Sequence, residues 1–175
     1  LASQRQHFDI PREVAYLNAA SWCPLPLATQ EAARQAVGRK GQPWKLDASF
    51  ANRQDERARA AAAHLIGADP GDIALVSSVG YGVAIAGKVL APAKGSRVLV
   101  LENDHTSPVL EWQTRAEAQG FTVETGPQPA DADWTSAVLA AIERPGARPL
   151  SLCSISSVHW SDGGLVDIAR VQAAL

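Results

Sequence analysis

The sequence predicts an α/β protein built on a mainly parallel β-sheet. From about residue 73 onward, short apolar segments alternate with longer segments of helical pattern. Strands separated by helices of this length are typical of parallel sheets with right-handed crossovers. The chain has 175 residues, is 46% hydrophobic and 19% charged, and is therefore long enough to bury a core. We divide it into an N-terminal helical segment, residues 1–72, and the first part of an α/β domain, residues 73–175.

The N-terminal segment contains two predicted helices. Gln30–Arg39 has a helical pattern that is broken by the glycine and proline of 41–43. Phe50–Ile66 is an alanine-rich helix, and Gly67 is placed to cap its end. The composition of 69–72 predicts a turn.

The α/β part is predicted from short β-branched runs and from helix-ending signals. Gly120 ends one helix, and Asp133 is a candidate N-cap for the next. The predicted strands are Ile73–Val76, Arg97–Leu101, Phe121–Glu124 and Pro149–Ile155. The predicted helices are Val83–Leu90, Val109–Gln119, Trp134–Ile142 and Asp167–Leu175.

Three loops follow predicted strands, and ligands bind parallel sheets beyond the carboxyl ends of their strands. The first loop, Ser77–Gly82, leads into a helix, and its glycines let the backbone approach an anion at the helix N-terminus. It is not a P-loop, because no Gly-Lys-Ser/Thr follows, and it lacks the full dinucleotide fingerprint. A tight strand-to-helix turn explains the same glycines.

The second and third loops carry histidines. His105 lies in Glu102–Pro108 and can hydrogen bond or stack on an aromatic ring, although a solvent-facing loop histidine is the simpler interpretation. The third loop, Ser156–Gly164, combines His159, Trp160 and Asp162, a mixture that suits a ligand site. A glycine-terminated turn with its tryptophan on the core is an equal alternative.

Composition argues against several other functions. The net charge of −2 gives no electrostatic reason to bind nucleic acid or an anionic membrane, and the apolar runs are too short to span a bilayer. Cys23 and Cys153 are far apart, so we expect no disulfide framework and a cytoplasmic location. The histidines and cysteines show no metal-ligand spacing, and no nucleophile elbow supports a serine triad.

Taken together, the motifs resemble the class V aminotransferases, the family of cysteine desulfurases, kynureninases and isopenicillin-N-epimerase-like enzymes. The run Tyr16–Pro26 is similar to the family's N-terminal segment, and 76–82 stands in place of its phosphate cup. Asp104–Ser107 followed by Trp112 resembles the family's Glu-His-x-Ser motif and later Trp, and 158–163 resembles its Val-Asn-Tyr-Arg-Thr-Gly. The resemblance covers residues 14–175.

The resemblance implies a three-layer α/β/α large domain, incomplete at its C-terminal side, that binds pyridoxal 5'-phosphate (PLP). It implies that Gly80 and Tyr81 bind the phosphate, that His105 stacks on the pyridine ring and that His159 lies beside the phenolic oxygen. It also implies that the segment around Asn18, Ala20 and Ser21 approaches the substrate.

The resemblance also implies functional residues that are not in this sequence. The four lysines, at 40, 45, 88 and 94, all precede the strand that leads to His105, so the Schiff-base lysine is expected beyond Leu175. The family usually has Thr or Ser at the positions of Gly80 and Tyr81, and an Asn at the position of His159. These departures bear on substrate and reaction more than on cofactor.

The resemblance predicts an enzyme that acts on an amino acid, either a transaminase or a desulfurase-like or kynureninase-like lyase, and that is a homodimer when intact. On this interpretation the present chain is a fragment and is inactive alone. The alternative is a non-catalytic α/β module that binds a phosphate or a nucleotide.

Overall fold

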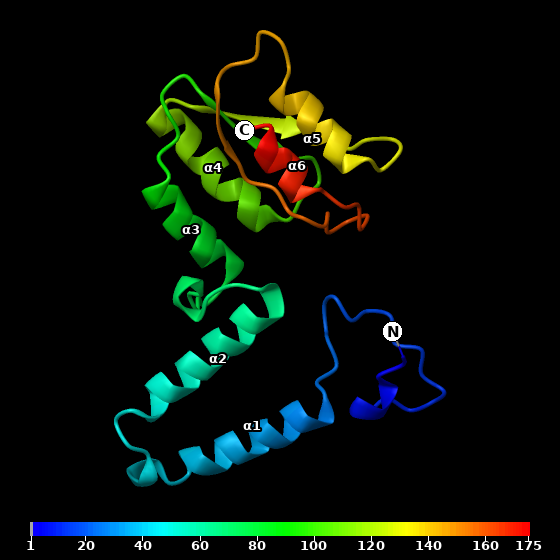
Figure 1. Cartoon of the computed structure of the whole chain (residues 1–175), viewed down its shortest axis with the longest axis vertical. Helices are drawn as coiled ribbons and strands as arrows, with labels where there is room; N and C mark the ends of the chain where they lie inside the picture. Colours follow the sequence, from blue (N-terminus) through cyan, green and yellow to red (C-terminus); the bar gives the residue numbers. More distant parts are fainter. Residues whose placement is uncertain (1) are drawn as a thin grey trace. The chain divides into compact units, whose positions relative to one another are not determined.

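The structure is a computed structural model that describes residues 2–175. The chain forms two compact units, the first ending at Ala74 and the second spanning Leu75–Leu175 (Figure 1). The helices of the first unit are the short 3-10 helices η1 (Arg5–His7), η2 (Pro43–Lys45) and η3 (Pro70–Asp72), and the α-helices α1 (Leu27–Lys40) and α2 (Phe50–Ile66). None of the described helices has the length and apolar character needed to cross a membrane.

Helix α2 has the predicted bounds, and a strong local signal sets its C-terminal end. Gly67 takes the left-handed conformation with φ 70°, which ends the helix. Arg59 of α2 donates to the carbonyl oxygens of Ile73 (2.8 Å) and Pro70 (2.8 Å), so the turn that follows is tied back to the helix. Helix α1 begins three residues before the predicted start, directly after Pro26.

The second unit is built on a parallel sheet, as predicted, with three strands rather than the four expected. The central strand β1 (Arg97–Leu101) pairs with β2 (Thr122–Gly126) on one side and with β3 (Leu150–Cys153) on the other. The helices of this unit are α3 (Val79–Val89), α4 (Thr106–Gln119), α5 (Trp134–Ile142) and α6 (Ile168–Ala173).

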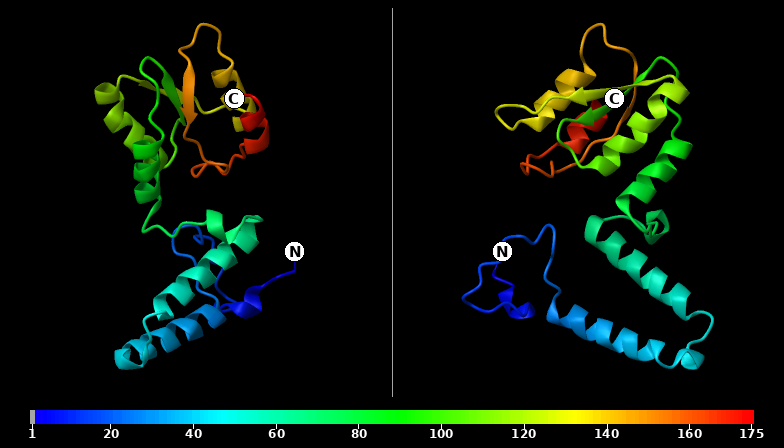
Figure 2. Two further views of the ribbon diagram at one scale, coloured as in Figure 1. Left: turned by 60° about the vertical axis from the view of Figure 1, so that its left-hand side comes forward. Right: turned by 180° about the vertical axis from the view of Figure 1, so that it is seen from behind.

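The side chains of β1 alternate between two buried layers, which confirms the predicted three-layer arrangement. Val98 and Val100 pack with Trp112 of α4, whereas Leu99 and Leu101 pack with Trp134 of α5 and with residues of α6. Figure 2 shows α4 on one side of the sheet and α5 and α6 on the other. All five residues of β1 are buried, so the central strand is the core of the unit.

One predicted strand of this region is absent, and two of its helices begin earlier than predicted. Ile73–Val76 does not form a strand, and Leu75 and Val76 are 53% and 48% exposed. β-Propensity depends on packing against a neighbouring strand, and no described strand lies beside this segment. Helices α3 and α4 begin four and three residues earlier than predicted, because Ser78 and His105 cap them.

Candidate functional site

The first turn of α3 follows an extended residue, Ser78, whose side chain caps the helix. The hydroxyl oxygen of Ser78 accepts the N–H of Tyr81 at 3.1 Å, and its carbonyl oxygen accepts the N–H of Gly82 at 3.1 Å. The N–H groups of Val79 and Gly80 precede these and have no acceptor within the helix. They carry the positive end of the helix dipole and are suited to an anion.

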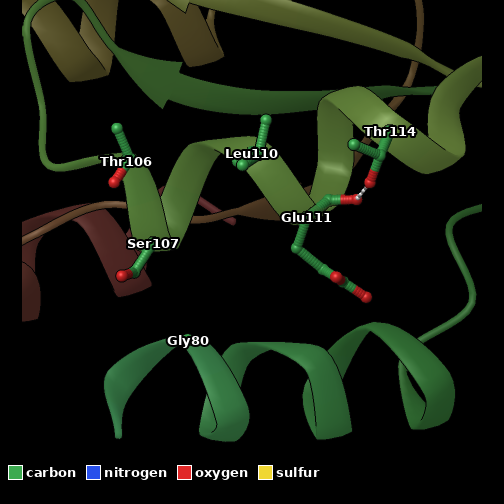
Figure 3. Close-up of a pocket in the computed structure, with 6 residues that line it drawn as sticks. All are labelled: Gly80, Thr106, Ser107, Leu110, Glu111 and Thr114. Atoms are coloured by element: carbon green, nitrogen blue, oxygen red, sulfur yellow. Dashed lines mark hydrogen bonds between the residues drawn. The ribbon is translucent and has the colours of Figure 1, made fainter.

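The first turn of α4 lies opposite the first turn of α3. A pocket of about 310 Å³ lies between the two helices and is lined by Gly80, Thr106, Ser107, Leu110, Glu111 and Thr114 (Figure 3). A Cβ atom at Gly80 would lie 3.8 Å from the hydroxyl oxygen of Ser107 and 3.9 Å from that of Ser78. The space at Gly80 is therefore flanked by two hydroxyl groups and by free helix N–H groups.

One carboxylate also lines this pocket. Glu111 forms an ion pair with Arg115 one turn later in α4, and both side chains are largely buried. Gly87 of α3 makes room for the pair, because a Cβ atom there would lie 2.7 Å from a carboxylate oxygen of Glu111. The arginine neutralises Glu111, so this carboxylate does not prevent an anion from binding near the helix N-termini.

His105 is exposed and is itself the N-cap of α4. Its Nδ1 accepts the backbone N–H of Ser107 at 3.3 Å. Because that N–H can only donate, Nδ1 carries no proton, and the proton of the neutral ring is on Nε2. The ring also makes a T-shaped contact with Trp160, with centroids 5.9 Å apart and planes at 85°. These contacts hold the ring while leaving it accessible.

His159 is fully buried, and both of its ring nitrogens are engaged. Nε2 lies 3.0 Å from the carbonyl oxygen of Glu102, and Nδ1 lies 3.1 Å from a carboxylate oxygen of Asp162. The ring stacks on Trp134, with centroids 4.2 Å apart. In this structure His159 therefore presents no free ring nitrogen to the cofactor contact predicted from the resemblance.

Asp162 accepts hydrogen bonds from three different residues and also faces His159. Its carboxylate accepts the backbone N–H of Gly164 (2.8 Å), the indole N–H of Trp134 (3.0 Å) and the side-chain amide of Gln128 (2.9 Å), and it faces His159. The Gly164 N–H is the main reason that the pKa of Asp162 is lowered, with Trp134 and His159 contributing further. The carboxylate is therefore ionised at neutral pH.

The residues predicted to approach the substrate lie in the first unit. Asn18, Ala20 and Ser21 are exposed and belong to a turn in which the carbonyl oxygen of Asn18 accepts the N–H of Trp22 at 3.2 Å. The hydroxyl group of Tyr16 donates to the carbonyl oxygen of Trp22 at 2.7 Å and closes the same turn.

The structure brings Gly80 together with the residues that directly follow His105. Tyr81 lies beside Gly80, but its N–H is already bound by Ser78 and its side chain is 55% exposed, so Val79 and Gly80 supply the free N–H groups. Sequence reasoning missed Ser78 and Ser107 as site residues. The predicted helix began at Val83, five residues after Ser78, so the capping role of Ser78 became visible only with the observed start of α3 at Val79.

No lysine lines the pocket between α3 and α4. Lys88 lies in the last turn of α3, and Lys94 packs against Gly120. Among residues 2–175, no group of three or more His, Cys, Asp or Glu side chains is arranged to hold a metal ion.

Comparison with known proteins agrees with this architecture. The family model described as aminotransferase class-V matches residues 32–174. No curated protein matches the chain.

Several solved structures share the fold. A mutant of C-DES with glycine covalently linked to its PLP cofactor superposes with a TM-score of 0.81 at 20% identity, over 99% of this chain and 46% of that one. The cystine C-S lyase C-DES in complex with its product cysteine persulfide gives 0.76 at 21%, over 91% and 42%. The cysteine desulfurase CsdA from Escherichia coli gives 0.70 at 22%, over 97% and 44%. The chain thus spans less than half the length of these proteins.

Proposed function

Because the chain belongs to the class V aminotransferase family, we propose that it supplies the phosphate-binding part of a PLP enzyme that acts on an amino acid. The observation that carries the proposal is the pair of helix N-termini that meet at Gly80 and Ser107, beyond the carboxyl ends of parallel strands. The proposal assigns residues 73–175 to the cofactor-binding domain and residues 1–72 to a separate helical segment.

The residues at this place suit the phosphate group of PLP. A phosphate needs several donors and a positive potential, and the first turn of α3 offers the N–H groups of Val79 and Gly80. The hydroxyl groups of Ser78 and Ser107 flank the space that Gly80 leaves open. Tyr81 is the next residue of the turn, and we propose that its exposed phenol hydroxyl group binds the phosphate.

The cofactor ring requires a flat partner, and His105 meets this requirement. Its Nδ1 accepts the N–H of Ser107, and its plane is nearly perpendicular to that of Trp160, so the imidazole is held in one orientation. A T-shaped contact with one tryptophan covers at most one face of the imidazole. A ring held in this way can stack on a pyridine ring. PLP, when bound, supplies the electron sink for reactions of amino acids, whereas the chain's residues bind and orient it.

The substrate and the reaction rest on weaker support. The solved structures include a cystine lyase and a cysteine desulfurase, which favours lyase chemistry on a sulfur-containing amino acid over transamination. We extend the proposal to Asn18, Ala20 and Ser21 as the segment that contacts substrate, to a homodimer and to a cytoplasmic location. On this proposal the lysine that anchors the cofactor is none of the four in this sequence.

Titration of the intact, PLP-free protein with PLP tests the proposal. We expect an absorbance change on binding and an affinity that falls about tenfold in Ser107→Ala, because a hydrogen bond to a charged group contributes about 1.5–3 kcal/mol. The matched control is Thr114→Ala, since Thr114 lies at the other end of the same pocket (Figure 3). This variant should bind PLP with wild-type affinity. Equal affinities in the two variants would contradict the assignment of Ser107.

The alternative function is a non-catalytic module that binds a phosphate or nucleotide. One observation favours it, namely that none of the four lysines lines the pocket. The same titration separates the two. If inorganic phosphate or a nucleotide binds more tightly than PLP, and borohydride fixes no PLP to the intact protein, the chain is a phosphate-binding module rather than part of a PLP enzyme.

A further inference from the structure

The loop that carries His105 is held by a second loop, the segment 156–164, which we call the brace segment. Three consecutive residues of the first loop each receive a hydrogen bond from it. His159 lies 3.0 Å from the carbonyl oxygen of Glu102, and the indole N–H of Trp160 donates to the carbonyl oxygen of Asn103. The hydroxyl group of Ser156 donates to the carboxylate of Asp104 at 3.1 Å.

The three contacts lead directly to His105. The carboxylate of Asp104 that binds Ser156 also accepts the backbone N–H of His105, at 2.7 Å. Trp160 contacts the His105 ring edge-on. Asn103, at the centre of the loop, has a positive φ of 56°, a left-handed conformation that asparagine adopts more readily than most other non-glycine residues. The hydrogen bond from Trp160 to its carbonyl oxygen ties the brace segment to the loop at this residue.

His159 is the most buried member of the brace segment, and its contacts indicate its charge. A carbonyl oxygen only accepts, so Nε2 donates to Glu102 and carries a proton. Nδ1 faces the carboxylate of Asp162. The carboxylate can accept a hydrogen bond from a protonated Nδ1, whereas it would repel the lone pair of an unprotonated one. The ring also stacks on Trp134, whose π face favours a cation. The competing arrangement is a neutral ring whose Nδ1 accepts the hydroxyl group of Ser161, 3.1 Å away.

We infer that the brace segment positions His105, and that its anchor is His159, held as an imidazolium against Asp162. This inference rests on the proposed function, because His105 is the residue assigned to the cofactor ring. His159 and Trp160 are then positioning residues that act through the backbone of Glu102 and Asn103. They need not touch the cofactor themselves.

The charge of His159 is tested by nitrogen NMR of the PLP-free intact protein labelled with ¹⁵N-histidine. We expect one buried histidine with protons on both ring nitrogens at neutral pH, assigned by its loss in His159→Gln. A neutral His159 with an unprotonated Nδ1, and a signal that changes in Ser161→Ala, would overturn the anchor role. Neither outcome depends on PLP, so this measurement stands apart from the proposed function.

The positioning role is tested with Trp160→Phe, which keeps an aromatic ring beside His105 and removes the donor to Asn103. We expect the His105 ring signals of the PLP-free protein to shift or broaden. We also expect PLP affinity to fall about fivefold, the effect of losing one hydrogen bond. The control is Trp44→Phe, since Trp44 is 77% exposed in the first unit. This variant should change neither the His105 ring signals nor the PLP affinity.

Two results distinguish the possible failures. Wild-type His105 signals and wild-type PLP affinity in Trp160→Phe would overturn the brace. If the wild-type protein binds no PLP but the His105 signals still respond to Trp160→Phe, the proposed function is wrong, whereas the positioning of His105 by the brace segment is supported. Should His159→Gln fail to fold, Asp162→Asn replaces it, since it removes the charge that faces the ring together with one of the two acceptor oxygens.

Discussion

The two ends of the β-sheet use their polar groups in opposite ways. At the amino end, Arg97 is 3% exposed and donates to the carbonyl oxygens of Arg148 (2.8 Å) and Ile142 (3.0 Å) and to the carboxylate of Glu124 (3.2 Å). Arg144 binds the same carboxylate at 2.8 Å. At the carboxyl end, the first turn of α3 has N–H groups without an acceptor in the helix.

This difference separates stability from function within one unit. The polar groups of Arg97 are satisfied inside the protein, so they contribute to the folded state and leave nothing for a ligand. The carboxyl end has N–H groups that no protein group satisfies and hydroxyl groups beside them, so these remain available to a ligand. Substitutions at the amino end should therefore change the free energy of unfolding, and those at the carboxyl end should change PLP binding.

The largest expected effect is that of Arg97→Met at the amino end. The substitution leaves the carbonyl oxygens of Arg148 and Ile142 without the Arg97 donor. Glu124 keeps only its exposed partner Arg144. We therefore expect a loss of about 3–5 kcal/mol in the free energy of unfolding. Urea denaturation of the intact protein measures it. Arg144→Met is the matched control, because Arg144 is 56% exposed and should cost about 1 kcal/mol or less. Similar losses in the two variants would remove the distinction between the buried and exposed arginines.

The next effect concerns Gly164 in the brace segment. A Cβ atom there would overlap Trp134, the buried residue that also binds Asp162, so Gly164→Ala should destabilise by about 1–3 kcal/mol. The loss should appear in thermal unfolding together with altered His105 signals. Gly38→Ala in α1, where nothing lies within 4 Å, serves as the control and should not destabilise. A stable Gly164→Ala variant would show that this loop relaxes freely.

A smaller effect is expected for Ser78, which caps α3. Ser78→Ala removes the acceptor for the Tyr81 N–H, and loss of such a cap costs about 1 kcal/mol. PLP binding should weaken as well, since the first turn of α3 is less well ordered. Ser78→Asn keeps a capping oxygen and should recover most of the stability. If Ser78→Asn binds PLP as poorly as Ser78→Ala, the hydroxyl group itself is a phosphate ligand.

The smallest effect is the acid dependence of Asp162, whose pKa is lowered mainly by the N–H of Gly164. A lowered pKa in the folded state stabilises above the ordinary value of 3.8, and this contribution is lost as the pH falls through the folded-state pKa. Denaturation at a series of acidic pH values should show a shallower decline in Asp162→Asn than in the wild type. Asp55→Asn, at an exposed position of α2, should decline like the wild type. Parallel curves for all three proteins would contradict the role of Asp162.

Local signals explain which elements could be predicted from the sequence. Strand β1 is a continuous β-branched and leucine run, α2 ends at a glycine that adopts positive φ, and α5 begins after Asp133, whose carboxylate accepts the N–H of Ser136 at 3.0 Å. In each case the residues that decide the structure lie within a few positions of it. Ile73–Val76 looked equally strand-like, but a strand needs a neighbour that local sequence does not reveal.

The candidate site divides in the same way. The glycines after a predicted strand and the place of His105 before a helix could be read from the sequence, as could the order of motifs that led to the family. The role of Ser107 could not, because it depends on α4 facing α3.

The sequence by itself determined the alternation of helices and strands, the parallel sheet and the family, since these follow from periodicity, caps and motif order. Only the tertiary structure decided that His159 is buried rather than open to a ligand. Its partner Glu102 lies 57 residues away along the chain. A contact at that separation depends on the crossovers that bring the ends of β1 and β3 together, and no local propensity encodes it.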